Sequence, residues 1–269
     1  MNLLPLKTLI LNTIFFITLA YPIAVSASPY KLSPVTDSIL IGSGAALSGM
    51  FLCSETRVAP LSDEEIASQS KNDINRFDRS AADNWSPASA KWSNGILAAI
   101  MVSPSGLLIE KDTRNDFVTL SVMYGESILI TTGLNGSVKN IVQRKRPYTY
   151  NSDVPDEEKK KTDSVRSFYS GHTANAFNSA VFISTVYADY YPESSLRFGV
   201  WGAALSAASL TGYLRYRAGK HYPTDIIAGA AAGSTTGWLV PALHRQGDGN
   251  ISLQVITGDE TMIAVIMNF

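Results

Sequence analysis

The chain has 269 residues, enough for one large domain or for one domain with a small appendage. Apolar residues make up 45% and charged residues 17%. This composition is more hydrophobic than that of most soluble proteins, but much less hydrophobic than that of a chain made only of membrane spans. A formal net charge of -1 excludes a global basic field that would attract nucleic acid, so we expect no nucleic-acid partner. The single cysteine, Cys53, excludes an internal disulfide.

The N-terminal residues have the pattern of a secretory signal peptide. Lys7 precedes an apolar run at residues 9–20, and the small residues Val25 and Ala27 suit cleavage after position 27. Residues 1–27 are therefore expected to be a signal peptide, and the alternative is an uncleaved N-terminal anchor. With either one, the working part of the chain is exported to the periplasm or the cell envelope.

The next part of the chain alternates apolar stretches with polar connectors. Apolar stretches at residues 38–53, 95–109 and 117–134 predict helical elements. Residues 54–94, between the first two, predict an amphipathic helix with a loop. Residues 135–171 predict a long polar loop that leads into the second half of the chain.

Three helices and two strands are expected in the second half. The helices are expected at residues 172–190, 196–214 and 224–243. Pro223 suits the first turn of the last helix. Two short strands at 251–257 and 262–269 are expected to surround a turn at 258–260.

These elements predict an all-α fold: a helical bundle of about five to six core helices with a short C-terminal β-hairpin. The expected domains after the signal peptide are an N-terminal helical segment at 28–94, a helical core at 95–245 and the C-terminal strands at 246–269. The sequence leaves the oligomeric state open.

Glycines recur at every fourth position of the last expected helix, at Gly229, Gly233 and Gly237. We interpret this spacing as close packing within one helix bundle, and the alternative is a pair of membrane helices. Whether the bundle crosses a bilayer stays open at this stage. The better candidates for spans are residues 196–214 and 226–243, because polar residues interrupt the other helices.

Three short segments place cations and imidazoles where a phosphate group would need them. They contain, in chain order, Lys139 and Arg146; Ser170, Gly171 and His172; and Arg215, His221 and Asp225. The chain has three histidines, and two of them fall in these segments. The joint occurrence predicts a phosphoryl-transfer site.

The cationic residues of these segments suit the charge of a transferring phosphoryl group, which lies mainly on its equatorial oxygens. Arg146 and Arg215 can each hold two oxygens through the guanidinium fork, and Lys139 adds a point charge. Gly171 allows its backbone N–H to approach an oxygen closely, and the Ser170 hydroxyl can donate a hydrogen bond. The start of the following helix adds a favourable dipole for an anion.

The two imidazoles can divide the remaining chemistry. One must attack phosphorus as a neutral ring, and the other must protonate the leaving oxygen. Asp225 follows His221 by four residues and can accept a hydrogen bond from one of its ring nitrogens, which fixes the tautomer. We therefore assign His221 as the nucleophile and His172 as the general acid that later activates water. No step demands a metal, and no metal-binding motif is found, so no cofactor is expected.

The three segments resemble the tripartite pattern of the type 2 phosphatidic acid phosphatase and vanadium haloperoxidase superfamily. The matching positions are Lys139, Arg146, Pro147, Ser170, Gly171, His172, Arg215, His221 and Asp225. The resemblance covers about residues 117–243. It implies an α-helical bundle, the same roles for both histidines, and vanadate as an inhibitor that imitates the transition state.

Two positions depart from this pattern: Tyr169 stands where the family usually has proline, and Leu214 where it usually has serine. The resemblance implies a phosphatase with a phosphohistidine intermediate, acting on a lipid phosphate or a small phosphate ester at or near a membrane. The alternatives are a vanadate-dependent haloperoxidase and an envelope protein that binds phospholipids without turnover.

Taken singly, each motif has an ordinary structural interpretation. Lys139 and Arg146 could belong to a solvated basic stretch, and His172 could pack at a helix start. His221 and Asp225 could be a structural pair at the beginning of a helix. His244 lies outside the three segments and is expected at the surface.

Overall fold

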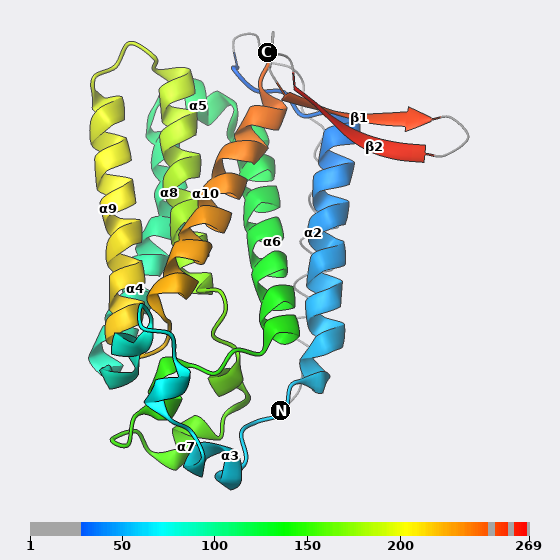
Figure 1. Cartoon of the computed structure of the whole chain (residues 1–269). Coiled ribbons are helices and arrows are strands. Elements are labelled where there is room, and N and C mark those ends of the chain that lie inside the picture. Colours follow the sequence, from blue (N-terminus) through cyan, green and yellow to red (C-terminus); the bar gives the residue numbers. More distant parts are fainter. Residues whose placement is uncertain (1–27, 247–250, 258–260, 268–269) are drawn as a thin grey trace.

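A computed structural model of the protein describes residues 28–246, 251–257 and 261–267. The predicted signal peptide at 1–27 lies outside the described residues. Within the described ranges, six long helices run side by side (Figure 1). They are α2 (Pro34–Ser54), α4 (Pro87–Val102), α6 (Phe117–Val142), α8 (Gly171–Tyr190), α9 (Leu196–Arg217) and α10 (Pro223–His244). The predicted all-α bundle is confirmed for this part of the chain.

Short elements complete the described chain. Three short helices are α3 (Asp63–Ala67), α5 (Lys111–Asn115) and α7 (Asp156–Lys159). Single 3-10 segments span Glu55–Arg57, Lys71–Asp73, Arg79–Asp83, Ser103–Ile109, Pro147–Tyr150 and Thr162–Val165. Strands β1 (Ile251–Thr257) and β2 (Thr261–Met267) pair antiparallel, with Ile251 opposite Met267. Residues 258–260 lie outside the description, so the hairpin turn stays a prediction.

Helix α6 is longer than the sequence indicated. Residues 135–142 were expected in a loop, yet they form its last two turns, and the helix ends where Gln143 adopts a left-handed conformation with a φ of 46°. The polar residues that suggested a loop bond to α2 instead: Ser137 Oγ donates to the Leu47 carbonyl at 2.7 Å, and Asn140 Nδ2 donates to the Phe51 carbonyl at 2.9 Å. Lys139 therefore lies on a helix.

Helix α4 begins before the expected domain boundary. The boundary between residues 94 and 95 falls inside α4, because Pro87 occupies the first turn and the Ser86 hydroxyl accepts a hydrogen bond from the Ser89 N–H at 3.1 Å. The predicted helices of the second half agree with α8, α9 and α10 to within a few residues at each end.

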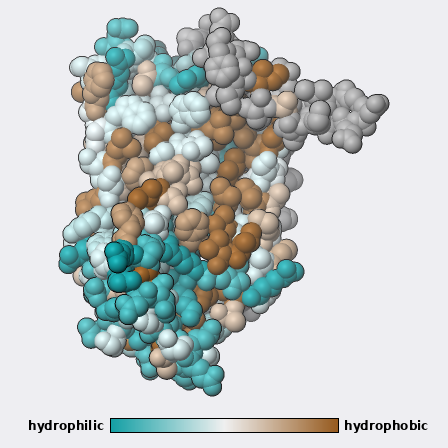
Figure 2. Space-filling view, viewed as in Figure 1, coloured by the Kyte–Doolittle hydropathy of each residue, from teal (hydrophilic) through white to brown (hydrophobic). Residues whose placement is uncertain are grey.

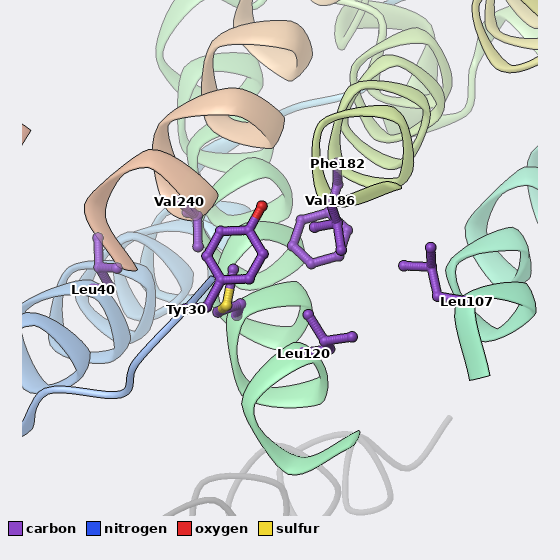
Figure 3. Close-up of a cluster of buried hydrophobic side chains, with 8 residues drawn as sticks. Tyr30, Leu40, Leu107, Leu120, Phe182, Val186 and Val240 are labelled. Carbon is purple, nitrogen blue, oxygen red and sulfur yellow. The ribbon is translucent and has the colours of Figure 1, made fainter. Parts of the chain in front are cut away.

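The largest hydrophobic cluster lies at the end of the bundle opposite α3 and α7 (Figures 1 and 3). It joins α2, α6, α8 and α10. Phe182 and Val186 of α8 belong to this cluster together with Met123 of α6, and Val240 of α10 lies beside Tyr30. Tyr30 is buried, although it precedes the first long helix, and its hydroxyl donates to Asp189 at 2.5 Å. The N-terminal part of the described chain is thereby anchored to the bundle.

The glycine face of α10 packs directly against the backbone of α8. A Cβ atom at Gly229, Gly233 or Gly237 would lie 2.6, 2.0 or 2.4 Å from the carbonyl oxygen of Ser170, Ala174 or Asn178, respectively. The recurring glycines therefore mark close packing between two helices of the bundle, as interpreted from their spacing. This contact also fixes the start of α8 against the start of α10.

Replacing Gly233 with alanine is expected to force α10 away from α8. Overpacking of this kind costs about 1–3 kcal/mol, which outweighs the gain of up to about 1 kcal/mol in helix propensity. Gly199 of α9 is the matched control, because nothing lies within 4 Å of a Cβ at that position. Thermal unfolding in detergent should show a lower Tm for G233A and an equal or higher Tm for G199A; equal shifts would contradict the close contact.

Four of the described helical segments are long and apolar enough to cross a membrane: Pro34–Arg57, Pro87–Ile109, Phe117–Tyr150 and Pro223–His244. The expectation for the last helix agrees with this result, whereas α9, the other expected span, is not among the four. Serine, glycine and arginine residues lower its hydropathy. Figure 2 shows hydrophobic surface along the middle of the bundle and a hydrophilic end around α3 and α7.

Candidate active site

Four helix ends meet at the hydrophilic end of the bundle. They are the C-terminal ends of α6 and α9 and the N-terminal ends of α8 and α10 (Figure 1). All three predicted segments lie at these ends, with Lys139 in the last turn of α6, His172 in the first turn of α8 and Arg215 in the last turn of α9. The fold thus brings together motifs that are far apart in the sequence.

His221 is buried, with 1% of its surface exposed, and its two ring nitrogens face different partners. Its Nε2 lies 3.2 Å from Nη1 of Arg146, and its Nδ1 lies 3.6 Å from Oδ2 of Asp225. A guanidinium can only donate hydrogen bonds, so Nε2 is the acceptor and the neutral ring carries its proton on Nδ1. The distance from Nδ1 to Asp225 is longer than a hydrogen bond. The lone pair of Nε2 nevertheless faces the cationic residues.

Arg146 is held rigidly beside His221. Its Nε and Nη2 donate to the backbone carbonyl and carboxylate of Asp163, both at 2.7 Å, and its Nη1 donates to the Lys220 carbonyl at 2.8 Å. The side chain is almost fully buried. It therefore supplies a fixed positive charge next to the imidazole, and not the mobile charge of a solvated basic stretch.

Asp225 is fully buried and forms several charge-assisted hydrogen bonds. Its Oδ2 accepts from Ser167 Oγ at 2.5 Å and from the Tyr222 N–H at 3.0 Å, and its Oδ1 accepts from Arg144 Nη1 at 2.6 Å. The bond from Tyr222 also satisfies an N–H group at the start of α10. Asp225 thus combines a helix-capping role with a fixed position beside Nδ1 of His221.

Arg144 and Asp78 extend this network, and the sequence analysis did not assign either of them to the site. Arg144 Nη2 donates to Asp78 Oδ2 at 2.7 Å, and its guanidinium lies 3.9 Å from the centre of the Tyr222 ring. Asp78 also accepts from the N–H and hydroxyl of Thr224 at 3.0 and 2.6 Å. The segment before α4 therefore fixes the first turn of α10.

Asp163 was also missed by the sequence analysis, because only the folded chain brings its carboxylate to Arg146.

His172 occupies the first turn of α8 and is partly exposed. Its Nε2 donates to Asn94 Oδ1 of α4 at 2.7 Å. Ser170 is buried and caps α8, since its hydroxyl accepts from the Thr173 hydroxyl at 2.8 Å and from the Thr173 N–H at 3.4 Å. The hydroxyl proton of Ser170 stays available for donation.

Gly171 faces Asn135 so closely that a Cβ would lie 2.5 Å from the Asn135 side-chain oxygen. Asn135 Nδ2 in turn donates to the Tyr169 carbonyl at 2.8 Å. Glycine is thus required by packing where the loop meets the helix, and its N–H belongs to the first turn, which has no partner within the helix. An anion can approach that N–H group.

Lys139 and Arg215 complete the cationic group. Arg215 is buried, and its Nη1 donates to Ser93 Oγ at 3.4 Å. Among the described residues, neither side chain has a carboxylate within 4.0 Å. Lys139 is partly buried, and a buried cation such as Arg215 is costly without a counter-charge, so this arrangement favours binding of an anion.

The same cations hold both site imidazoles in their neutral form. Burial lowers the pKa of His221 well below its usual value, and the charges of Arg146, Lys139 and Arg215 lower it further. Burial, followed by Arg215, Lys139 and Arg146, lowers the pKa of His172 to about 3. The same three cations thus act on both imidazoles, although His172 and His221 come from different segments.

Two arginines separated by one residue allow a matched test of this unit. Arg215 is buried among the site residues, whereas Arg217 is exposed. Arg215→Ala should lower kcat/KM for a phosphate ester by about 10²–10³, the effect of removing one fixed donor to a developing oxyanion. Arg217→Ala should change it by less than about threefold, as is usual for surface substitutions. Equal losses in both variants would contradict the placement of Arg215.

Comparison with known proteins gives two similar crystal structures and one family model. A crystal structure titled as the first transmembrane PAP2 type phosphatidylglycerolphosphate phosphatase from Bacillus subtilis aligns with a TM-score of 0.45 and 22% identity, covering 74% of this chain and 94% of that one. A crystal structure of Aquifex aeolicus LpxE aligns with a TM-score of 0.41 and 24% identity, covering 60% and 90%. No curated protein matches the sequence significantly. The family model of the PAP2 superfamily matches residues 120–247, the part of the chain that carries all three motifs.

Proposed function

We propose that this protein is a membrane-associated phosphatase that hydrolyses a lipid phosphate through a phosphohistidine intermediate on His221. The observation that carries the proposal is the unprotonated Nε2 of buried His221, which faces buried Arg146 and lies in the field of Lys139 and Arg215. A phosphoryl group placed there meets fixed positive charges and an imidazole lone pair at once. The match of residues 120–247 to the PAP2 superfamily model supports the same class of activity.

In the first half-reaction, Nε2 of His221 attacks phosphorus and the bond from phosphorus to the leaving oxygen breaks. Lys139, Arg146 and Arg215 stabilise the charge of the equatorial oxygens, together with the N–H of Gly171. His172 transfers a proton to the leaving oxygen. Asp225 stabilises the Nδ1–H side of His221, which becomes positively charged as the bond to phosphorus forms.

In the second half-reaction, water attacks the phosphorus atom of phosphohistidine. His172 accepts the proton from this water, the bond from nitrogen to phosphorus breaks, and inorganic phosphate is released. Both steps use only side chains and water, so the mechanism operates without a metal at the reacting centre.

The lipid preference follows from where the site lies. Four segments of the described bundle can span a membrane, and one of them, Phe117–Tyr150, carries Lys139 and Arg146 near its C-terminal end. Exposed hydrophobic side chains such as Trp92, Ile141 and Phe198 cover the sides of the bundle. A substrate held in the bilayer by its acyl chains would therefore present its phosphate at the level of the site.

The test compares three phosphate monoesters with the purified protein in detergent: long-chain phosphatidate, short-chain phosphatidate and 4-nitrophenyl phosphate. We expect kcat/KM for the long-chain lipid to exceed that for the aryl phosphate by at least about tenfold, a factor that corresponds to 1.4 kcal/mol. The short-chain lipid separates the contribution of the head group from that of the chains. Equal values for all three substrates would remove the lipid preference, and no release of phosphate from any ester would remove the proposed activity.

Binding of an anion should be coupled to proton uptake. The site cations keep the pKa of His172 at about 3 in the free protein, and a bound dianion offsets their effect and raises that pKa. The complex therefore holds more protons, so affinity should fall as pH rises through the higher pKa of the bound form. Tungstate is a suitable probe, because it remains a dianion at neutral pH. Calorimetry in two buffers of different ionisation enthalpy should show proton uptake that decreases in His172→Asn; zero uptake in both proteins would contradict this coupling.

A further inference from the structure

A second group of polar residues is buried at the end of the bundle away from the proposed active site. Asp37 lies in the first turn of α2, Glu126 lies in α6 and His244 is the last residue of α10. All three are buried, which corrects the expectation that His244 is an ordinary surface residue. The helices fold so that one ligand atom from each residue lies within 4.8 Å of the others.

The orientation of the His244 ring is fixed by the backbone. Its Nδ1 lies 2.8 Å from the Val240 carbonyl oxygen, so Nδ1 carries a proton and donates it. Nε2 faces both carboxylates, at 2.9 Å from Asp37 Oδ1 and 3.4 Å from Glu126 Oε2. A histidine that donates one ring N–H to a backbone carbonyl and directs the other nitrogen at carboxylates has the second-shell geometry of a metal ligand.

Glu126 gives the independent indication of a cation. Its side chain is completely buried, and within the described part of the chain neither of its oxygens has a hydrogen-bond partner. A buried carboxylate without donors is costly. A proton on His244 would bond well to Asp37 and would leave both Glu126 oxygens unsatisfied, whereas a divalent cation would be ligated by both acids at once.

The separations between the ligand atoms suit a small transition-metal ion. Two ligands at about 2.1 Å from a tetrahedral ion lie roughly 3.4 Å apart. The distance from His244 Nε2 to Glu126 Oε2 is 3.4 Å, and that to Asp37 Oδ1 is 2.9 Å, so small side-chain movements suffice. One imidazole and two carboxylates match Zn²⁺ better than Ca²⁺ or Mg²⁺, which prefer oxygen ligands alone.

A surface cleft lies next to this group. A cleft of about 480 Å³ opens at this end of the protein. It is lined by Lys31, Leu32, Ser33, Pro34, Leu243, His244, Arg245 and Gln246. Of the three residues in the group, His244 lines this cleft, although its side chain is fully buried.

We propose that Asp37, Glu126 and His244 bind one Zn²⁺ ion, which joins α2, α6 and α10 at the end opposite the phosphatase site. Three protein ligands leave a fourth position for water. The ion stabilises the attachment of α2 to the bundle and takes no part in phosphoryl transfer. No sequence motif indicates this site, because its ligands are separated by about a third of the chain or more.

The test measures zinc binding to the full-length protein in detergent after metals have been removed with a chelator. Calorimetry should show one Zn²⁺ per chain, and the Tm should rise as the zinc concentration increases. Glu126→Gln and His244→Gln should each weaken binding by at least about tenfold and reduce the Tm shift. Glu193→Gln removes an exposed carboxylate between α8 and α9 and should bind zinc like the parent protein.

Three further measurements keep the result unambiguous. His221→Ala should still bind one Zn²⁺, which separates this site from the imidazoles of the phosphatase site. Tungstate binding to the Glu126 and His244 variants reports whether the rest of the bundle is folded. X-ray absorption should show one nitrogen and two carboxylate ligands from the protein. Absence of zinc binding in the parent protein, or equal binding in folded Glu126→Gln and His244→Gln, would overturn the proposal.

Discussion

His221→Ala is expected to lower kcat by about 10⁴ or more, because the substitution removes the nucleophile and leaves only binding and charge stabilisation. After a brief reaction with ³²P-labelled substrate and a denaturing quench, the parent protein should carry label that is lost in acid and stable in base. His221→Ala should carry none. His172→Ala lacks the acid that protonates the leaving group, so its label should form more slowly. It also lacks the base that activates water, so label that has formed should persist for longer.

Tungstate binding is the control for correct folding of the His221→Ala variant. His221→Ala should bind tungstate measurably, since Lys139, Arg146 and Arg215 remain in place. A variant that binds tungstate and still acquires acid-labile label would show that another residue is the nucleophile. The proposed assignment of His221 would then be wrong, although the charge-based argument for phosphate binding would remain.

Asp225→Asn is expected to lower kcat by about 10³–10⁴ with a much smaller change in KM. Loss of the carboxylate beside a catalytic imidazole costs about 10⁴ in serine proteases, where it fixes the tautomer and stabilises the charged ring. Here Oδ2 lies 3.6 Å from Nδ1 of His221 and Oδ1 bonds to Arg144, so the neutral amide removes charge from both contacts. Steady-state kinetics over a range of pH measures the effect.

Asp63→Asn is the control for Asp225→Asn, because Asp63 is an exposed carboxylate at the same end of the protein. It should leave kcat unchanged within about threefold. Because Asp225 also caps α10, thermal unfolding of both variants must be compared. A folded Asp225→Asn protein with nearly unchanged kcat would show that the carboxylate only positions the helix.

Local patterns were sufficient to predict the helical bundle. Apolar runs and turn residues predicted the positions of α8, α9 and α10, and the glycine spacing on α10 predicted close helix packing. Residues 135–142 were wrongly expected in a loop, because Ser137 and Asn140 resemble loop residues until their partners on α2 are known. Such tertiary hydrogen bonds override local composition.

The residues of the candidate site could be proposed from three motifs, but their supporting partners could not. Asp163 and Asp78 bond to Arg146 and Arg144 across long sequence separations, and nothing in their immediate neighbours distinguishes them from surface acids. His244 was misplaced for the same reason, since only the fold brings Asp37 and Glu126 to it. Motif recognition finds chemistry whose spacing is fixed along the chain and misses contacts that only folding creates.

The central claim is that three separate segments surround one phosphorus atom with His221 as its nucleophile. A structure of the protein with bound vanadate tests this claim most directly, because vanadate adopts the geometry of phosphorus during transfer. We predict a bond from vanadium to Nε2 of His221, equatorial oxygens held by Arg146 and Arg215, and His172 facing the oxygen opposite His221. Vanadate bound away from these side chains, or coordinated by a residue other than His221, would contradict the account.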